Sequence, residues 1–286
     1  MNARAPSSAR RRPAAGLSSL ARTVRDGDYD RFLTTLFAPP EKREPLLALI
    51  AFNLEIARVR DAVREPMLGQ IRLQWWREAL AEAAAGKPRR HDVLDGLSGT
   101  SVPPALIEEM LDARETELAP EPPATVADFH AYASGTSGAL SEAIAAILGA
   151  DEPTRSTARR VGTAFGLIGI LRATRYLGRR GRVLLPSHAL DEAGTSVAAL
   201  KELRSEPGLA RTAERIAAAA KEELDTARAN RLSVKQARAA VLLAPLADAY
   251  LARLAAEKFD LLNGNLSLGP LRKQVAVGWA AARGKF

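Results

Sequence analysis

Apolar residues recur at three- and four-residue steps over most of the chain from Asp28 onward, which is the spacing of amphipathic helices. No alternation of apolar and polar residues typical of a strand continues for more than a few positions. The pattern predicts helices over residues 41–64, 67–86, 104–118, 126–149, 153–178, 207–231, 234–257 and 268–283. We therefore predict a single all-α domain of about eight to ten helices over residues 26–286.

Two of these segments also indicate what is buried. The face shared by the apolar positions of 41–64 holds Leu46, Leu49, Ile50, Asn53, Ala57 and Asp61. The centre of 153–178 is apolar on every side, which predicts a helix in the middle of the domain. The adjacent Trp75 and Trp76 cannot face the same way on a helix. One is expected in the core and the other at a helix seam or the surface.

The net charge of +8 on 286 residues suggests binding to nucleic acid until the charges are located. Residues 1–25 hold six arginines and no acidic residue, which leaves 35 of the 41 basic residues against 33 acidic ones in the rest of the chain. A nearly neutral body argues against a broad phosphate-binding face. We therefore expect no nucleic-acid partner.

Residues 1–25 are predicted to form a flexible basic leader. Their Arg, Ser, Ala and Pro content is typical of an organellar transit peptide, and it also suits an arm that contacts anionic lipid. The third interpretation is an unstructured leader with no role. The longest unbroken apolar run, AFGLIGIL, is far shorter than the roughly 20 residues of a spanning helix, so we predict that no segment crosses a membrane.

Residues that carry common catalytic chemistry are scarce. The absence of Cys excludes disulfides, Cys-ligated zinc and thiol catalysis. His91, His130 and His188 have no second His one turn away and are expected to be surface or capping residues. The sequence has no Walker loop, dinucleotide-binding glycine motif or serine nucleophile elbow. Carboxylates spaced along facing helices, which hold Mg²⁺ in all-α enzymes that act on diphosphates, are the remaining possibility.

Two segments resemble the signature regions of the squalene/phytoene synthase family. The first is AFNLEIARVRD followed by RLQWWREAL, and the second is GTAFGLIGILRATRYLGRRGRVLLP. The resemblance covers roughly residues 28–265 and implies an isoprenoid-synthase-like helical bundle around a central cavity. The positions of the second segment that match the family pattern in register are Gly162, Ala164, Leu167, Ile170, Leu171, Arg172, Gly181, Arg182, Leu185 and Pro186.

The metal-binding acids of the family fall, by this resemblance, on Ala57, Arg58, Asp61, Ala173, Tyr176 and Leu177. Only Asp61 is acidic, so one of six expected carboxylates remains, and Gly166 and Gly169 replace polar residues of the pattern. One carboxylate cannot hold a magnesium cluster, and Arg58 would place a positive charge where the metal belongs. We therefore expect no metal, no cofactor and no catalytic residue at these degenerate positions.

One branch of this family resembles the chain more specifically. The segments LDARETEL, LRATRYLGRRGRVLLP and APLADAYLARLAAEKFDLLN are similar to the non-catalytic branch that assists the assembly of respiratory complex I, which also lacks the aspartates. This resemblance implies a complex I subunit or assembly intermediate as partner. It also implies a position peripheral to the membrane, either at the inner face of a bacterial cytoplasmic membrane or on the mitochondrial matrix side.

Five arginines lie close together at the end of the second signature region: Arg172, Arg175, Arg179, Arg180 and Arg182. One interpretation is an anion site for a diphosphate, a lipid head group or an acidic partner. The ligand-binding residues would then be Arg58, Asp61, Arg172, Arg175 and Arg182. The other interpretation is a solvated helix C-terminus, where the helix dipole favours Arg, with Arg58 and Asp61 paired to each other one turn apart.

Two further functions compete with the assembly role. The first is an active Mg²⁺-dependent prenyl transferase that condenses two prenyl diphosphates with unusual ligands. The second is a membrane-associated binding module anchored by the leader. The apolar residues at former metal positions suit a cavity that holds an isoprenoid or lipid, and they equally suit a packed interior.

Overall fold

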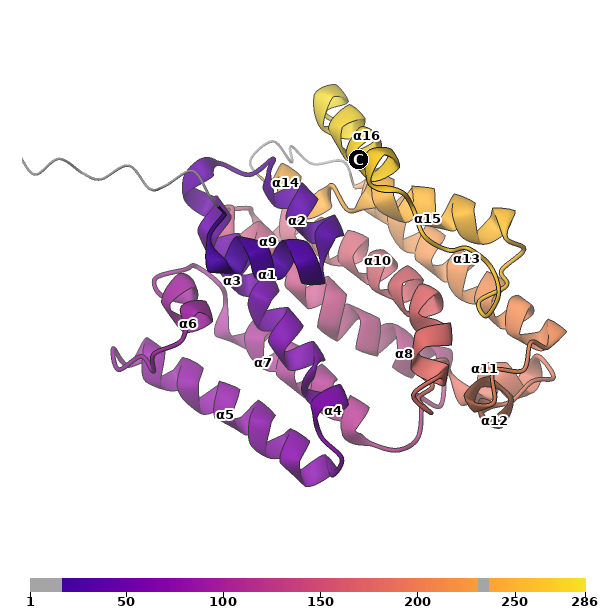
Figure 1. Ribbon diagram of the computed structural model, residues 1–286. Helices are drawn as coiled ribbons and strands as arrows, with labels where there is room; N and C mark the ends of the chain where they lie inside the picture. Colours follow the sequence, from indigo (N-terminus) through magenta and orange to yellow (C-terminus); the bar gives the residue numbers. More distant parts are fainter. Residues whose placement is uncertain (1–16, 231–236) are drawn as a thin grey trace, which may run out of the picture.

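The computed structural model describes residues 17–230 and 237–286, and the regular structure within these residues is entirely helical (Figure 1). The predicted all-α class is therefore confirmed. The helices are α1 (Ser19–Gly27), α2 (Tyr29–Thr35), α3 (Pro40–Ala57), α4 (Val59–Ala62), α5 (Pro66–Ala84), α6 (Asp92–Leu97), α7 (Pro104–Glu115), α8 (Val126–Ala133), α9 (Ala139–Ile147), α10 (Glu152–Gly178), α11 (Ser187–Glu192), α12 (Val197–Lys201), α13 (Pro207–Ala229), α14 (Arg238–Val241), α15 (Ala244–Ala256) and α16 (Pro270–Arg283).

Side-chain caps and prolines determine where these helices begin. The Asp151 side chain accepts the backbone N–H of Thr154 at the start of α10. Thr125 and Asp128 form a reciprocal capping box at the start of α8. Proline occupies the first turn of α3, α5, α7, α10, α13, α15 and α16, where its missing N–H removes no helical hydrogen bond.

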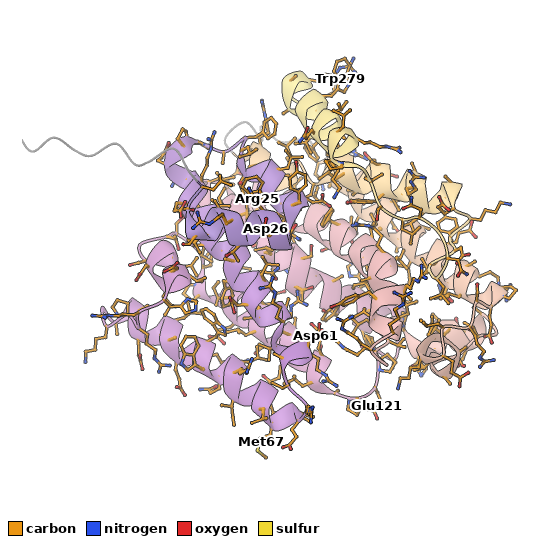
Figure 2. All side chains as sticks on the ribbon, in the orientation of Figure 1. Arg25, Asp26, Asp61, Met67, Glu121 and Trp279 are labelled. Atoms are coloured by element: carbon orange, nitrogen blue, oxygen red, sulfur yellow. The ribbon has the colours of Figure 1, made fainter. Side chains whose placement is uncertain are left out.

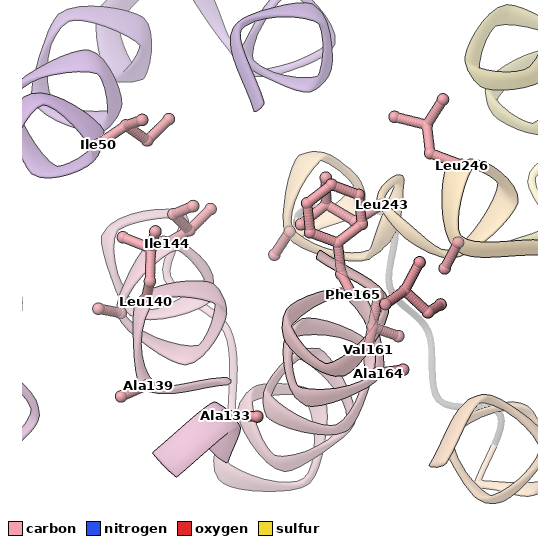
Figure 3. Packing of buried hydrophobic residues seen from close by; sticks show 14 of the residues in the cluster. Ile50, Ala133, Ala139, Leu140, Ile144, Val161, Ala164, Phe165, Leu243 and Leu246 are labelled. Atoms are coloured by element: carbon pink, nitrogen blue, oxygen red, sulfur yellow. The ribbon is translucent and has the colours of Figure 1, made fainter. Parts of the chain in front are cut away.

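Helix α10 occupies the centre of the molecule, with α9 on one side and α13 and α15 on the other (Figure 1). Figure 3 shows Phe165 of α10 pointing toward Leu243, which lies between α14 and α15. The predicted central burial of this segment is confirmed. The α10 residues that are at most 1% exposed include Val161, Ala164, Leu167, Ile168 and Leu171.

Three predicted helices are divided in the structure. Segment 41–64 breaks at Arg58 into α3 and α4, and segment 234–257 becomes α14 and α15. Residues 234–236 of that segment lie outside the described part, as does residue 231 at the end of the predicted helix 207–231. Segment 126–149 contains a π-helical turn, Ser134–Gly138, between α8 and α9. The turn faces α10, where the Ser137 hydroxyl donates to the carbonyl oxygen of Gly162 at 2.6 Å. Helices α2, α6, α11 and α12 were not predicted, because they are too short for a clear apolar period.

The flexible leader was predicted to extend to residue 25, but its last residues are helical. Helix α1 begins at Ser19, and its Leu20, Ala21 and Val24 are buried against α3 and α6. The apolar i, i+1 and i+4 positions of this short helix are enough to fix it to the domain. Residues 1–16, which include the arginines at 4 and 10–12, lie outside the described residues.

The two tryptophans separate as predicted. Trp76 is 5% exposed and meets the Phe52 ring edge-on at a centroid distance of 5.2 Å. Trp75 is 36% exposed and lies at the surface of α5, where the Arg89 guanidinium stacks on its ring. The prediction of one core and one surface tryptophan is confirmed.

Among the described residues, one stretch, Arg238–Ala256, is long and apolar enough by length and composition to cross a membrane. Its unbroken apolar runs are short, because Pro245, Asp248 and Arg253 interrupt them. It comprises α14, α15 and the turn between them. Its apolarity matches its position in the protein core. Its side chains that are at most 1% exposed include Leu242, Leu243, Leu246, Tyr250 and Leu254.

We expect Gly162→Ala to destabilise the fold by about 1–3 kcal/mol, because overpacking has this cost where neighbours cannot move. An added Cβ would lie 2.4 Å from the backbone oxygen of Ser137 and 2.4 Å from the Ser141 hydroxyl. Gly169, about two helical turns further along α10, has no atom within 4 Å of the position that an added Cβ would take.

Gly169→Ala is therefore the matched control, and it should be neutral or stabilising by up to about 1 kcal/mol through helix propensity. Urea unfolding of both variants measures the difference. Equal midpoints for Gly162→Ala and the natural chain would contradict the close contact between α10 and the π-helical turn.

Candidate functional site

The two signature regions meet at a cavity of about 250 Å³ between the ends of α3, α4 and α10. Ala57 and Asp61 line it from one side, and Ala173 and Leu177 line it from the other. Ala173 and Leu177 are spaced i, i+4 on α10 and lie on the same helix face. Ala57 ends α3 and Asp61 lies in α4, and both line the cavity. The structure therefore brings together four of the six degenerate motif positions. Gly166 and Gly169 lie in the same wall.

The other two motif positions lie outside the cavity. Arg58 is exposed, and its guanidinium lies on the side of Gly27 in α1. Tyr176 is 50% exposed, and the Arg180 guanidinium stacks on its ring at 3.7 Å. The expectation that Arg58 places its charge at the former metal position is therefore wrong, because its side chain leaves the helix about 100° away from that of Ala57.

The arginine cluster does not form one site. Arg172 packs over the Tyr250 ring, with its guanidinium carbon 3.5 Å from the ring centroid. Arg175 is exposed, as are Arg179 and Arg180 near the C-terminus of α10, which fits the interpretation of a solvated helix end. Arg182 alone of these five lines the cavity.

Arg182 links the two acidic side chains of the cavity. One guanidinium nitrogen lies 2.6 Å from Asp61 Oδ1, and the other lies 2.5 Å from Glu117 Oε2. Asp61 is thus held by a residue 121 positions later in the chain. The alternative of an isolated Arg58–Asp61 pair does not describe the structure.

Glu117 is the buried residue of this site that the sequence did not reveal. It lies in a 3₁₀ turn, Thr116–Leu118, and its side chain is 5% exposed. Its Oε1 accepts hydrogen bonds from Arg114 at 2.7 Å and from the Tyr132 hydroxyl at 2.7 Å. Arg60 donates to its backbone oxygen at 3.1 Å. The i, i+3 spacing of Arg114 and Glu117 indicates an ion pair, but nothing local indicates that the pair is buried.

Burial raises the energy of the charged form of Glu117. The attraction of Arg114 and the hydrogen bonds that Glu117 accepts from Arg114 and Tyr132 nevertheless hold the pKa of this carboxyl below its ordinary value. Burial also raises the pKa of Tyr132, so its phenol stays protonated and donates to Glu117. Glu117 therefore remains charged at neutral pH, where its carboxylate faces the guanidinium groups of Arg114 and Arg182. We call Asp61, Arg114, Glu117, Tyr132 and Arg182 the Glu117 network.

A larger cavity of about 860 Å³ lies beside the first one. Both are lined by Glu117, Tyr132, Arg182 and Leu184, so members of the Glu117 network form the wall between them. The outer parts of the larger cavity come from α7, α8 and the loop 119–123. Its other acidic lining residues are Glu108, Glu109, Asp112, Glu121 and Asp128.

The residues present do not fit the magnesium cluster that the resemblance associates with active enzymes. Asp61 and Glu117 both contact Arg182, so the position between them holds a guanidinium. The facing positions on α10 are Ala173 and Leu177, which offer no oxygen ligand. No group of three or more His, Cys, Asp or Glu suited to a metal occurs within residues 17–230 and 237–286.

The histidines take the surface and capping positions that we expected. His91 Nδ1 accepts the backbone N–H of Val93 at the start of α6. His130 Nε2 lies 2.9 Å from Glu223, and His188 is exposed. None of the three lines either cavity.

We expect Glu117→Gln to destabilise the protein by about 3 kcal/mol or more, because removing one partner of a buried ionic network leaves the other charges uncompensated. The matched control is Glu192→Gln, which removes an exposed pair with Arg215. That change should cost less than about 1 kcal/mol. Chemical unfolding at neutral pH measures both.

The same comparison has a defined pH dependence. Because the folded-state pKa of Glu117 is lowered, its stabilisation is complete above the unfolded-state value of about 4.3 and is lost as the pH falls through the folded-state pKa. The difference in unfolding free energy between the natural chain and Glu117→Gln should therefore shrink in acid. A difference that grows on acidification would contradict a charged Glu117 in the folded protein.

Comparisons with known proteins agree with this geometry. The family model of squalene/phytoene synthase matches residues 24–273. The human "NADH dehydrogenase (ubiquinone) complex I, assembly factor 6" is 30% identical over 168 residues, which are 57% of this chain and 50% of the human protein. Its homolog from Drosophila melanogaster is 26% identical over 253 residues, 82% of this chain and 74% of that one. The chain thus spans about half the length of the human relative.

The fold matches a crystal structure of a dehydrosqualene synthase in complex with ligand, with a TM-score of 0.79 and 18% identity. That match covers 92% of this chain and 94% of the other. The predicted isoprenoid-synthase-like bundle around a central cavity is confirmed. Together with the family match over residues 24–273, this shows that the chain belongs to the squalene/phytoene synthase family.

Proposed function

We propose that this chain is a catalytically degenerate member of its family that acts in the assembly of respiratory complex I. The observation that carries the proposal is the replacement of a metal site by the Glu117 network. Of the four inward motif positions, only Asp61 is acidic, and Arg182 neutralises it. A site built in this way has no means of binding Mg²⁺ or of stabilising a leaving diphosphate.

The partner that we propose is a complex I subunit or assembly intermediate. Support comes from the relatives in human and Drosophila melanogaster, whose names state a role as complex I assembly factors. We place the protein at the membrane that holds complex I, on the bacterial cytoplasmic side or the mitochondrial matrix side. The fold supports binding rather than chemistry, because a packed ionic network occupies the position of the reaction centre.

A prenyl diphosphate ligand is not part of the proposal. In the smaller cavity Arg31 contacts Asp28, and Arg114 and Arg182 contact Glu117, so their charges are already compensated. In the larger cavity, Glu108 and Asp112 pair with Arg77, and Glu109 pairs with Arg159, so these charges are compensated as well. Glu121 and Asp128 take part in no ion pair among the described residues, and they repel a diphosphate or an anionic lipid head group.

The first test is enzymatic. Purified protein incubated with farnesyl or geranylgeranyl diphosphate and Mg²⁺ should release no diphosphate above the protein-free rate, because the carboxylates that would hold the metal are missing. Formation of squalene or phytoene that Asp61→Asn abolishes would overturn the non-catalytic assignment.

The second test is genetic. Deleting the gene in its source organism should lower the amount of assembled complex I on native gels and leave the isoprenoid content unchanged. The natural chain and Asp61→Asn should both restore assembly, since Asp61 is 34% exposed and its pair with Arg182 is worth at most about 1 kcal/mol. Lost isoprenoid with normal complex I would favour the prenyl transferase instead.

A further inference from the structure

Helix α16 carries apolar residues on two opposite faces. Its inner face packs against α15 and α2 and buries Val277 and Ala281. Its outer face exposes Leu271 by 73%, Val275 by 60% and Trp279 by 60%. A helix with one face packed on the core normally has polar residues on its outer face. The outer face of α16 has no cover from the residues that the structure describes.

The exposed residues form one continuous stripe. Leu271, Val275 and Trp279 are spaced i, i+4 and i+8, so they follow one another along about 12 Å of the helix surface. Figure 2 shows Trp279 at one extremity of the molecule, directed away from the body. A flat partner can therefore approach Trp279, at one end of the stripe, from outside the body.

Polar contacts hold α16 in this orientation. Lys273 lies 2.7 Å from Asp30, which also accepts the Tyr250 hydroxyl at 2.7 Å. The Gln274 amide donates to the Tyr29 hydroxyl at 2.9 Å, and Arg238 donates to the carbonyl oxygen of Ala281 at 3.0 Å. Because Lys273 and Val277 face the body, the stripe on the opposite side stays in solvent.

The charge around the stripe has a single sign. Residues 261–286 contain Arg272, Lys273, Arg283 and Lys285 and no acidic residue. Lys273 faces Asp30, whereas the other three are exposed and take part in no ion pair among the described residues. The Arg283 guanidinium carbon lies 4.0 Å from the centroid of the Trp279 ring. An apolar stripe with a tryptophan and neighbouring cations matches an anionic lipid surface, where acyl chains meet negative head groups.

A second exposed stripe on α5 lacks this charge pattern. Met67, Leu68 and Ile71 are 67%, 48% and 58% exposed, close to the values on α16. Cations and acids alternate near them, with Arg64 next to Glu65. Figure 2 places Met67 at the opposite end of the molecule from Trp279, so one flat membrane cannot contact both stripes. This makes α5 an internal control for α16.

We propose that the outer face of α16 is a docking surface for an anionic phospholipid bilayer. Leu271, Val275 and Trp279 enter the head-group region, and Arg272, Arg283 and Lys285 contact lipid phosphates. The surface deepens the proposed function by naming the part of the chain that holds it at the membrane. Its lipid binding is a property of the isolated protein and does not require complex I.

The experiment is co-sedimentation of the full chain with vesicles of phosphatidylglycerol mixed with phosphatidylcholine. We expect the natural chain to bind these vesicles, and to bind pure phosphatidylcholine at least about ten-fold more weakly, because several cations act together. The double variant Val275→Ser/Trp279→Ser should bind the mixed vesicles at least about ten-fold more weakly than the natural chain. Ile71→Ser, which removes an equally exposed residue from α5, should bind like the natural chain.

Unchanged thermal unfolding of the double variant shows that the loss is not due to misfolding, since both residues are 60% exposed. The proposal is overturned if the double variant binds as tightly as the natural chain, as it would if the basic leader alone held the lipid. It is also overturned if Val275→Ser/Trp279→Ser converts a dimer to a monomer without changing vesicle binding, because the stripe would then contact a second copy. Vesicle binding through α16 together with normal complex I in the deletion strain would refute the proposed function and leave the docking surface standing.

Discussion

A buried carboxylate, that of Glu117, joins four segments that lie far apart in the sequence. It accepts hydrogen bonds from Arg114 at the end of α7 and Tyr132 in α8, and it pairs with Arg182 in the loop after α10. Arg182 extends the network to Asp61 in α4. A charge that is 5% exposed is stable only when all of its partners are in place. The arrangement of these segments around the smaller cavity therefore depends on this one group.

The fold and the positions of the motif were predictable because both follow from local periodicity. The central burial of α10 follows from apolar residues on all its sides, and the shared direction of Ala173 and Leu177 follows from their i, i+4 spacing on that helix. Neighbouring residues on a helix point about 100° apart, which also directs Arg58 away from the side of Ala57. The prediction for Arg58 was wrong because it treated Ala57, Arg58 and Asp61 as one site.

The Glu117 network could not be predicted in the same way. Its members come from residues 61, 114, 117, 132 and 182, and their contacts depend on how α4, α7, α8 and the loop after α10 pack. A local pattern marks Arg114 and Glu117 as a helical pair but not as a buried one. Likewise, the apolarity of Arg238–Ala256 reflects core burial, while the shorter stripe on α16 is exposed. Sequence alone does not separate these two cases.

The metal site and the Glu117 network exclude each other for electrostatic reasons. A divalent cation next to Asp61 would lie against the Arg182 guanidinium, which repels it. Restoring an acid at Ala57 alone would leave the facing positions, Ala173 and Leu177, without ligands. A magnesium cluster would need acidic residues at several of these positions at once. The Glu117 network thus stabilises these segments in an arrangement in which no single substitution restores a magnesium cluster.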